Sequence, residues 1–180
     1  MDFMELARTR RSIREYSGQD IPAEALEQCV EAARHAPSAC NAQPWKFIIV
    51  TDPGKRAAIA KAVSPGRLQL NKFASRARAF IVIVSGNTCL PAGLGGLFRN
   101  TDFRQIDAGI ACGHVVMAAW DLGIGSCILG WFDERTIKKL LNVPAAKRVH
   151  LVIALGYPAS KNTDGKQMKD ASLTVGRDSY

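Results

Sequence analysis

A long helical segment without a polar side constrains the fold of this chain more than any other feature. Residues 105–122 have helical spacing, and the stretch from Ala108 to Trp120 is apolar on nearly every side. Such a helix is buried all round, so it lies either in the middle of the core or at a contact between subunits. Gly109 and Gly113 would let another backbone approach closely, although a helical glycine costs about 1 kcal/mol relative to alanine. We therefore expect a central helix that forms a homodimer, with an ordinary core helix as the alternative.

Apolar runs and capping residues predict the remaining elements. Helices are expected over residues 2–10, 22–35, 53–63 and 133–141. Strands are expected over residues 45–50, 79–85 and 149–155, with a short strand or turn at 125–131 and an edge strand at 172–176. The glycine-rich segment 87–102 is typical of a binding loop or lid. Since no internal repeat or linker interrupts this order, we expect one domain over residues 1–180.

The overall composition argues against several classes of protein. No run of 18 uncharged apolar residues occurs, so we expect no membrane span, and the N-terminus lacks the pattern of a secretory signal, so we expect a cytoplasmic protein. The five cysteines contain no C-x-x-C pair, and none of the three histidines lies near a cysteine pair, which argues against a disulfide scaffold or a zinc site. The net charge of +8 is spread along the chain without a nucleic-acid-binding motif, so we expect no nucleic-acid partner.

Two short polar clusters are the candidates for a binding site. The first, residues 10–14 (R-R-S-I-R), carries three guanidinium groups, which bind phosphate through paired hydrogen bonds. Arg10 and Arg14 would share one face if the first helix continued through them. Surface basic runs of this kind are also common without any ligand, and that interpretation stays open.

The second cluster, residues 36–45 (A-P-S-A-C-N-A-Q-P-W), has a backbone stiffened by two prolines. Asn41 and Gln43 supply hydrogen-bond donors and acceptors suited to a ring with alternating N–H and C=O groups, while a turn bonded to its own side chains is the alternative. The chain has no G-x-G-x-x-G, Walker A or G-x-S-x-G motif. The two clusters together therefore favour a phosphorylated, planar cofactor that carries its own chemistry.

The order of these motifs resembles the opening of the nitroreductase superfamily of FMN-dependent oxidoreductases. R-R-S-x-R is followed by a helix, by A-P-S-x-x-N-x-Q-P-W and by an apolar strand. The resemblance continues later in the chain. The D-A-G at 107–109 with its alanine-rich helix is similar to a landmark of that family, as are segments 122–127, 128–132, 140–144 and 154–158. The likeness covers essentially the whole chain, and the combination in this order is specific although each motif alone is not.

The resemblance implies an α+β fold with a central mixed β-sheet flanked by helices, built as an intertwined homodimer with two FMN molecules at its interface. It implies a ping-pong reaction in which hydride passes from NADH or NADPH through flavin N5 to a small-molecule acceptor, such as a nitroaromatic, a quinone or an enone. Two alternatives remain: another flavin chemistry such as reductive dehalogenation, and a flavin-binding sensor or storage protein with little turnover.

The resemblance also implies roles for individual residues. Arg10 would bind the FMN phosphate, Arg11 and Ser12 would reach phosphate or ribityl oxygens, and Arg14 would lie near flavin N1 and O2, where a cation stabilises the reduced anionic ring. The ring itself would be lined, from the same chain or from the partner, by Pro37, Ser38, Ala39, Asn41 and Gln43, with Leu129 and Gly130 near N5. No catalytic side chain and no metal are implied.

The C-terminal segment departs from the family pattern. Members often end with a basic pair, commonly K-x-R, that closes on the phosphate, whereas this chain has G-K-Q-M-K at 165–169. Lys166 or Lys169 is therefore the expected replacement. Cys40 lies within the second cluster, either as a redox-active neighbour of the flavin or as an inert small residue.

Overall fold

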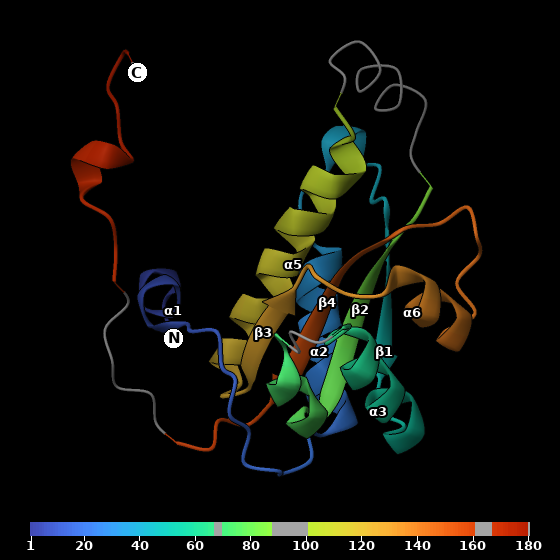
Figure 1. The fold of residues 1–180 in the computed structure, drawn as a ribbon. Coiled ribbons are helices and arrows are strands. Elements are labelled where there is room, and N and C mark those ends of the chain that lie inside the picture. Colours follow the sequence, from blue (N-terminus) through green and yellow to red (C-terminus); the bar gives the residue numbers. More distant parts are fainter. Residues whose placement is uncertain (67–69, 88–100, 161–166, 180) are drawn as a thin grey trace.

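Four antiparallel strands form the central sheet of the chain (Figure 1). The computed structural model describes residues 1–66, 70–87, 101–160 and 167–179. The strands are β1 (Trp45–Val50), β2 (Ala79–Ser85), β3 (Gly125–Leu129) and β4 (Val149–Gly156), in the order β1-β2-β4-β3. Every residue of β2 is buried, which is the environment that its continuous apolar sequence predicts.

Five α-helices accompany the sheet in the described residues. They are α1 (Phe3–Thr9), α2 (Ala23–Arg34), α3 (Pro53–Ala62), α5 (Phe103–Asp121) and α6 (Glu134–Leu140). Four of them begin at an aspartate whose side chain accepts a backbone N–H of the first turn, the standard N-cap interaction, and these are Asp2, Asp52, Asp102 and Asp133. Short 3₁₀ turns lie at Ala39–Asn41, Lys72–Arg76 and Ala171–Leu173.

The helices cover the two faces of the sheet separately. Helices α2 and α5 pack on the face that carries Ile81, Ile83 and Ile153. Helices α3 and α6 pack on the opposite face with Phe80 and Val82, since successive strand residues point to opposite sides. In Figure 1 α3 and α6 accordingly lie together, apart from α5.

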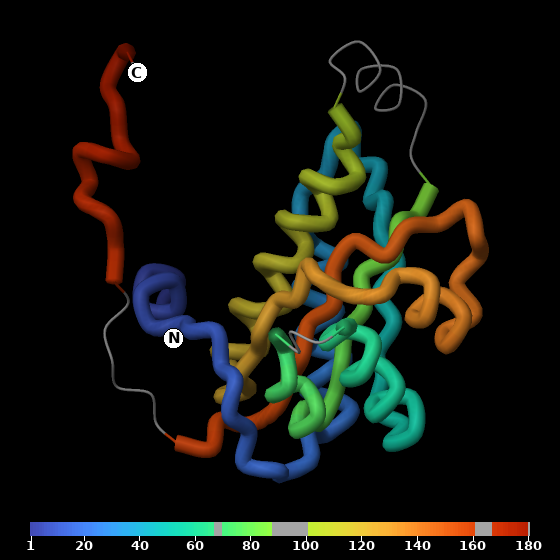
Figure 2. The backbone as a smooth tube through the Cα atoms, viewed as in Figure 1, coloured from blue at the N-terminus to red at the C-terminus, as the bar shows by residue number. Residues whose placement is uncertain are grey.

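The α+β class with a central sheet flanked by helices is confirmed. The four strands are all antiparallel, and in the described part of the chain the parallel component expected of a mixed sheet is limited to one bridge, between Ser12 and Ser126. The edge strand expected at 172–176 is wrong, because this segment begins with the 3₁₀ turn at Ala171–Leu173 and continues without strand structure. The described residues 167–179 are exposed and run apart from the sheet (Figure 2).

Helix α5 is buried on one side only. Ile106 is 50% exposed and Gly109 is exposed, although the sequence predicts burial all round. A Cβ added at Gly109 or Gly113 would meet no other part of the chain within 4 Å. The packed side contacts α2 and the sheet, so a second partner would be needed to cover the glycine side. Among the residues that the structure describes, no helix is long and apolar enough to cross a membrane.

Candidate functional site

The first polar cluster lies along the free edge of β3. Helix α1 ends at Thr9 with Arg10 as its C-cap, so the helix does not continue through the cluster and Arg10 and Arg14 do not share a helical face. The chain continues as an extended segment, residues 10–16, which we call the arginine strap. Ser12 forms a parallel bridge with Ser126, and the Ile13 N–H donates to the Ser126 carbonyl at 2.9 Å. The strap thereby occupies the edge of the sheet.

Two glycines allow the arginine strap to lie directly on the sheet. A Cβ at Gly125 would come within 2.8 Å of the Ile13 side chain, and one at Gly156 within 2.6 Å of the Tyr16 ring. The Tyr16 hydroxyl is buried and donates to the carbonyl of Ile13 at 3.1 Å or of Ala154 at 3.3 Å. Sequence reasoning missed these supports, although the glycines that begin β3 and end β4 were a visible signal of close backbone approach.

The cationic groups of the strap have different surroundings. Arg14 lies 5.9 Å from the centroid of the Phe73 ring. Burial raises the pKa of the Cys127 thiol, while the positive charges of Arg14 and Arg10 act in the opposite direction. In the described part of the chain neither Arg10 nor Arg14 forms an ion pair with a carboxylate. Arg11 differs, because its guanidinium donates to the carbonyls of Arg8 and Arg10 at 2.7 and 3.0 Å.

The strap therefore carries two cations that no described carboxylate neutralises, beside the exposed Ser12 hydroxyl. Leu129 and Gly130 continue from the same β3 strand, three residues after Ser126. Leu129 is buried, and Gly130 is exposed with open space around its α-carbon. Arginine pairs with neighbouring hydroxyl and backbone groups are typical of phosphate sites, and this edge of the sheet can bind an anion.

The second cluster forms a separate loop, residues 37–44, which we call the proline loop. Three of its non-glycine residues adopt positive φ: Cys40 at 52°, Asn41 at 51° and Gln43 at 46°. The Gln43 N–H donates to Ser38 Oγ at 2.9 Å, and its Nε2 donates to Asn41 Oδ1 at 3.0 Å. The self-bonding that the alternative interpretation predicts therefore occurs. Strained backbone of this kind gathers at functional sites.

The loop presents its predicted ring-lining groups unequally. Pro37, Asn41 and Gln43 are exposed, whereas Ser38 and Ala39 are half-buried. The Ala39 N–H donates to Oδ1 of Asp107, on α5, at 3.1 Å. Sequence reasoning did not assign Asp107 to the site.

The arginine strap and the proline loop lie at opposite ends of α5. Trp120 Nε1, near the C-terminal end of the helix, donates to Thr9 Oγ1 at 3.0 Å, directly before the strap. Asp107, which binds the proline loop, lies thirteen residues earlier, a separation of about 20 Å at 1.5 Å per helical residue. One chain therefore does not bring the two predicted halves of the site together.

The predicted C-terminal cation has no described link to either half. Lys169 is exposed in the segment that runs apart from the sheet. Lys166 lies outside the described residues, as does most of the glycine-rich segment 87–102.

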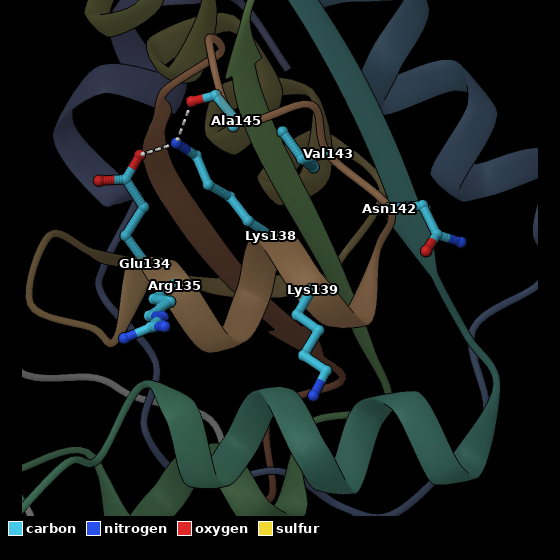
Figure 3. A pocket seen from close by; sticks show the side chains of 7 residues that line it. All are labelled: Glu134, Arg135, Lys138, Lys139, Asn142, Val143 and Ala145. Carbon is cyan, nitrogen blue, oxygen red and sulfur yellow. Dashed lines mark hydrogen bonds and ion pairs between the residues drawn. The ribbon is translucent and has the colours of Figure 1, made fainter.

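A cavity of about 620 Å³ beside α6 also carries several cations, but they do not converge. Figure 3 shows Lys138 directed at the Ala145 carbonyl and at Glu134, at 3.0 and 3.4 Å, while Arg135 and Lys139 point elsewhere. Glu134 also accepts the Val149 N–H at 2.9 Å. This group fixes α6 to β4 and does not form a ligand site. Within the described ranges, no three histidine, cysteine or acidic side chains are grouped as metal ligands.

Comparisons with known proteins identify relatives over most of the chain. The family model described as "Nitroreductase family" matches residues 7–72 and 67–157. An Archaeoglobus fulgidus protein, provisionally named an NADH dehydrogenase/NAD(P)H nitroreductase, is 36% identical over 159 residues, which are 86% of this chain and 84% of the relative. An iodotyrosine deiodinase of Haliscomenobacter hydrossis is 29% identical over 173 residues, 83% of this chain and 76% of the relative. A solved FMN-dependent nitroreductase of Clostridium difficile R20291 shares the fold, with a TM-score of 0.75, 24% identity and coverage of 99% and 100%.

Proposed function

The chain belongs to the nitroreductase family, and on that premise we propose that it is an FMN-dependent oxidoreductase that takes hydride from NADH or NADPH and reduces a small-molecule acceptor. The arginine strap carries this proposal. It presents Arg10 and Arg14, without a described carboxylate partner, beside an exposed hydroxyl at a sheet edge.

The chemistry of these groups fits FMN. Arg10 and Ser12 match a phosphate and the ribityl oxygens, and Arg14 matches the N1/O2 edge, where a fixed cation favours negative charge on the ring. The side-chain amides of Asn41 and Gln43 match the ring's alternating donors and acceptors. When bound, FMN would supply the acceptance and donation of hydride, and the protein groups would bind and orient it. Nη1 of Arg11 donates to two carbonyls at the end of α1, and the other N–H groups of its guanidinium are proposed to reach phosphate or ribityl oxygens.

A second copy of the chain is the proposed partner that completes the site. Asp107 and Trp120 lie six and seven residues on either side of Gly113. Gly113 is half-buried, and a Cβ added there would meet no atom within 4 Å. Two α5 helices that cross antiparallel near Gly113 would set the proline loop of one chain beside the arginine strap of the other. Apolar side chains are also exposed on α1, on or directly after α5, and on β3, namely Phe3, Met4, Ile106, Leu122 and Ile128. Exposed apolar side chains of this kind would be covered by a protein contact.

The acceptor is proposed as a nitroaromatic, a quinone or an enone. Reductive dehalogenation is the second candidate, and the 29% identity to an iodotyrosine deiodinase favours it specifically. Both chemistries would use the same flavin, bound by the same arginine strap, and they would differ only in the acceptor.

Flavin uptake followed by anaerobic reduction tests the proposal. The protein should bind FMN, become yellow and lose its colour when NADH or NADPH is added without oxygen, and the colour should return with nitroaromatic, quinone or halogenated-phenol acceptors presented one at a time. A protein that takes up no FMN contradicts the proposal and both flavin alternatives. A yellow protein that neither nucleotide reduces would favour a sensor or storage role.

A further inference from the structure

Asp107 is an acidic residue in an apolar helix. It is 3% exposed and lies on α5, whose other buried residues are alanine, cysteine and valine. A buried carboxyl group is costly unless other groups donate hydrogen bonds to it. Its presence at this position therefore calls for a specific partner.

That partner is the proline loop. Oδ1 of Asp107 accepts the Ala39 N–H at 3.1 Å, across 68 residues of sequence. In the residues that the structure describes, the Asp107 side chain forms this one hydrogen bond. It is also the one hydrogen bond there between the proline loop and α5. No described ion pair involves Asp107.

The proline loop needs such a fixed point. Its positive-φ residues, Cys40, Asn41 and Gln43, each have a conformation that costs about 1–3 kcal/mol. At its far end the loop is held by the Gly86 N–H, which donates to the Pro44 carbonyl at 2.9 Å, with the two backbones so close that a Cβ at Gly86 would lie 2.9 Å from Pro44. The bond to Asp107 fixes its beginning. Between these points the hydrogen bonds described for the loop are local, such as Asn41 N–H to the Ser38 carbonyl at 3.0 Å.

We propose that Asp107 is a positioning residue for the cofactor: by fixing Ala39 it holds the proline loop against α5 in the conformation that presents the Asn41 and Gln43 amides to the flavin ring. This inference rests on the proposed function for the identity of the ligand. Asp107 acts through Ala39 and touches neither FMN nor substrate. Because α5 also carries the open glycine side, the same residue would set the loop relative to the subunit contact.

Two substitutions of Asp107 separate the hydrogen bond from the burial of the side chain. Asp107→Asn keeps an oxygen that can accept the Ala39 N–H, whereas Asp107→Leu keeps the branched shape of the side chain, at a larger volume, without an acceptor. Loss of a hydrogen bond that orders a binding loop is expected to weaken FMN binding about five- to tenfold. Asp107→Leu should show this loss, and Asp107→Asn should bind FMN within about twofold of the wild type.

Ala39→Pro removes the donor at the other end of the same bond. Ala39 is the first residue of the short 3₁₀ turn, where proline is tolerated because that N–H has no partner within the turn. If Asp107 acts through this bond, Asp107→Leu should have no further effect on FMN affinity in the Ala39→Pro background. Additive losses in the double variant would overturn the inference.

Hydrogen exchange of the FMN-free protein provides a readout that does not depend on the cofactor. Amides 39–43 should exchange faster in Asp107→Leu than in wild type, and as in wild type in Asp107→Asn, while amides of the buried strand β2 stay unchanged. Unchanged exchange at residues 39–43 in the Leu variant would overturn the inference, as would equal loss of FMN affinity in the Asn and Leu variants. Failure of wild-type protein to bind FMN would instead contradict the proposed function. Hydrogen exchange at residues 39–43 would then still test whether Asp107 holds the loop.

Discussion

The arginine strap and the proline loop are both short polar segments, but they are held in place by different means. The strap is bonded to the edge of β3, and its apolar residues, Ile13 and Tyr16, press onto glycines of the sheet. The loop keeps its shape through its own side chains and strained backbone, with fixed points at Asp107 and Gly86. Ile13 and Tyr16 thus anchor the strap to the core, and changes beneath it should affect folding, whereas changes in the loop should mainly affect binding.

The largest expected effect comes from combining a defect in each region. Arg10→Glu should abolish phosphate binding by charge reversal, and Ser38→Trp should fill the ring side of the site, since Ser38 has ordinary extended backbone that accepts a large residue. If each site draws its strap and loop from different chains, a heterodimer of the two variants contains one doubly defective site and one intact site. Co-expression with two affinity tags should therefore recover one tightly bound FMN per heterodimer, while either homodimer recovers almost none.

The same experiment can contradict the proposal that each site draws its strap and its loop from different chains. If strap and loop of one chain served the same site, every site in the heterodimer would carry a defect and no tight binding would return. Wild-type chains carrying the same two tags provide the control for purification and for the full FMN content.

Arg10→Ala should cause the next largest change. A charge-assisted hydrogen bond contributes about 1.5–3 kcal/mol, so FMN affinity should fall roughly ten- to a hundredfold while the subunit contact, which does not need Arg10, persists. Fluorescence titration of FMN and size-exclusion chromatography measure the two properties. Arg135→Ala is the matched control, because this exposed arginine lies on α6 and outside the strap. Unchanged affinity in the Arg10 variant would reject the phosphate role.

Gly156→Ala should affect the strap through the core. The new methyl group would lie 2.6 Å from the Tyr16 ring, and overpacking of this kind typically costs 1–3 kcal/mol. The Tm of the FMN-free protein should fall by about 2–12 °C for a chain of this size. Gly130→Ala is the stability control, since its Cβ would meet no atom within 4 Å. A melting temperature equal to that of the control would show that the strap does not depend on close contact with the sheet.

Local patterns predicted the elements better than their relative placement. The strands at 45–50 and 79–85 and the helix after Asp52 follow directly from apolar runs and capping, and they are confirmed. The end of α1 was predicted to within one residue, but the extended strap that follows could not be predicted, because it is favoured by bonding with β3, more than 100 residues later. The role of Asp107 was hidden for the same reason, since its partner Ala39 is distant in sequence. The distance between strap and loop follows from tertiary structure alone, and the roles of both in FMN binding stay predictions.

The smallest expected effect is a change in the reactivity of one thiol, Cys40, which reports on the proline loop directly. Cys40 is exposed in the proline loop, whereas Cys29, Cys112 and Cys127 are buried. Burial raises the pKa of Cys29 to about 11, that of Cys112 to about 12, and that of Cys127 as well. A raised thiol pKa lowers the fraction of reactive thiolate at pH 8, so those three cysteines should react slowly until the pH approaches their pKa values or the chain unfolds. In a Cys89→Ser background, which removes the cysteine outside the described residues, Ellman's reagent should rapidly modify Cys40 alone.

FMN should then slow the reaction of Cys40 several-fold if the loop faces the ring in the assembled protein. The protection should disappear in Arg10→Ala at FMN concentrations that saturate only the wild type, because the strap supplies the affinity even though the thiol lies on the loop. Equal reaction rates with and without saturating FMN would show that the proline loop does not lie against the flavin. The proposed site would then be reduced to the arginine strap.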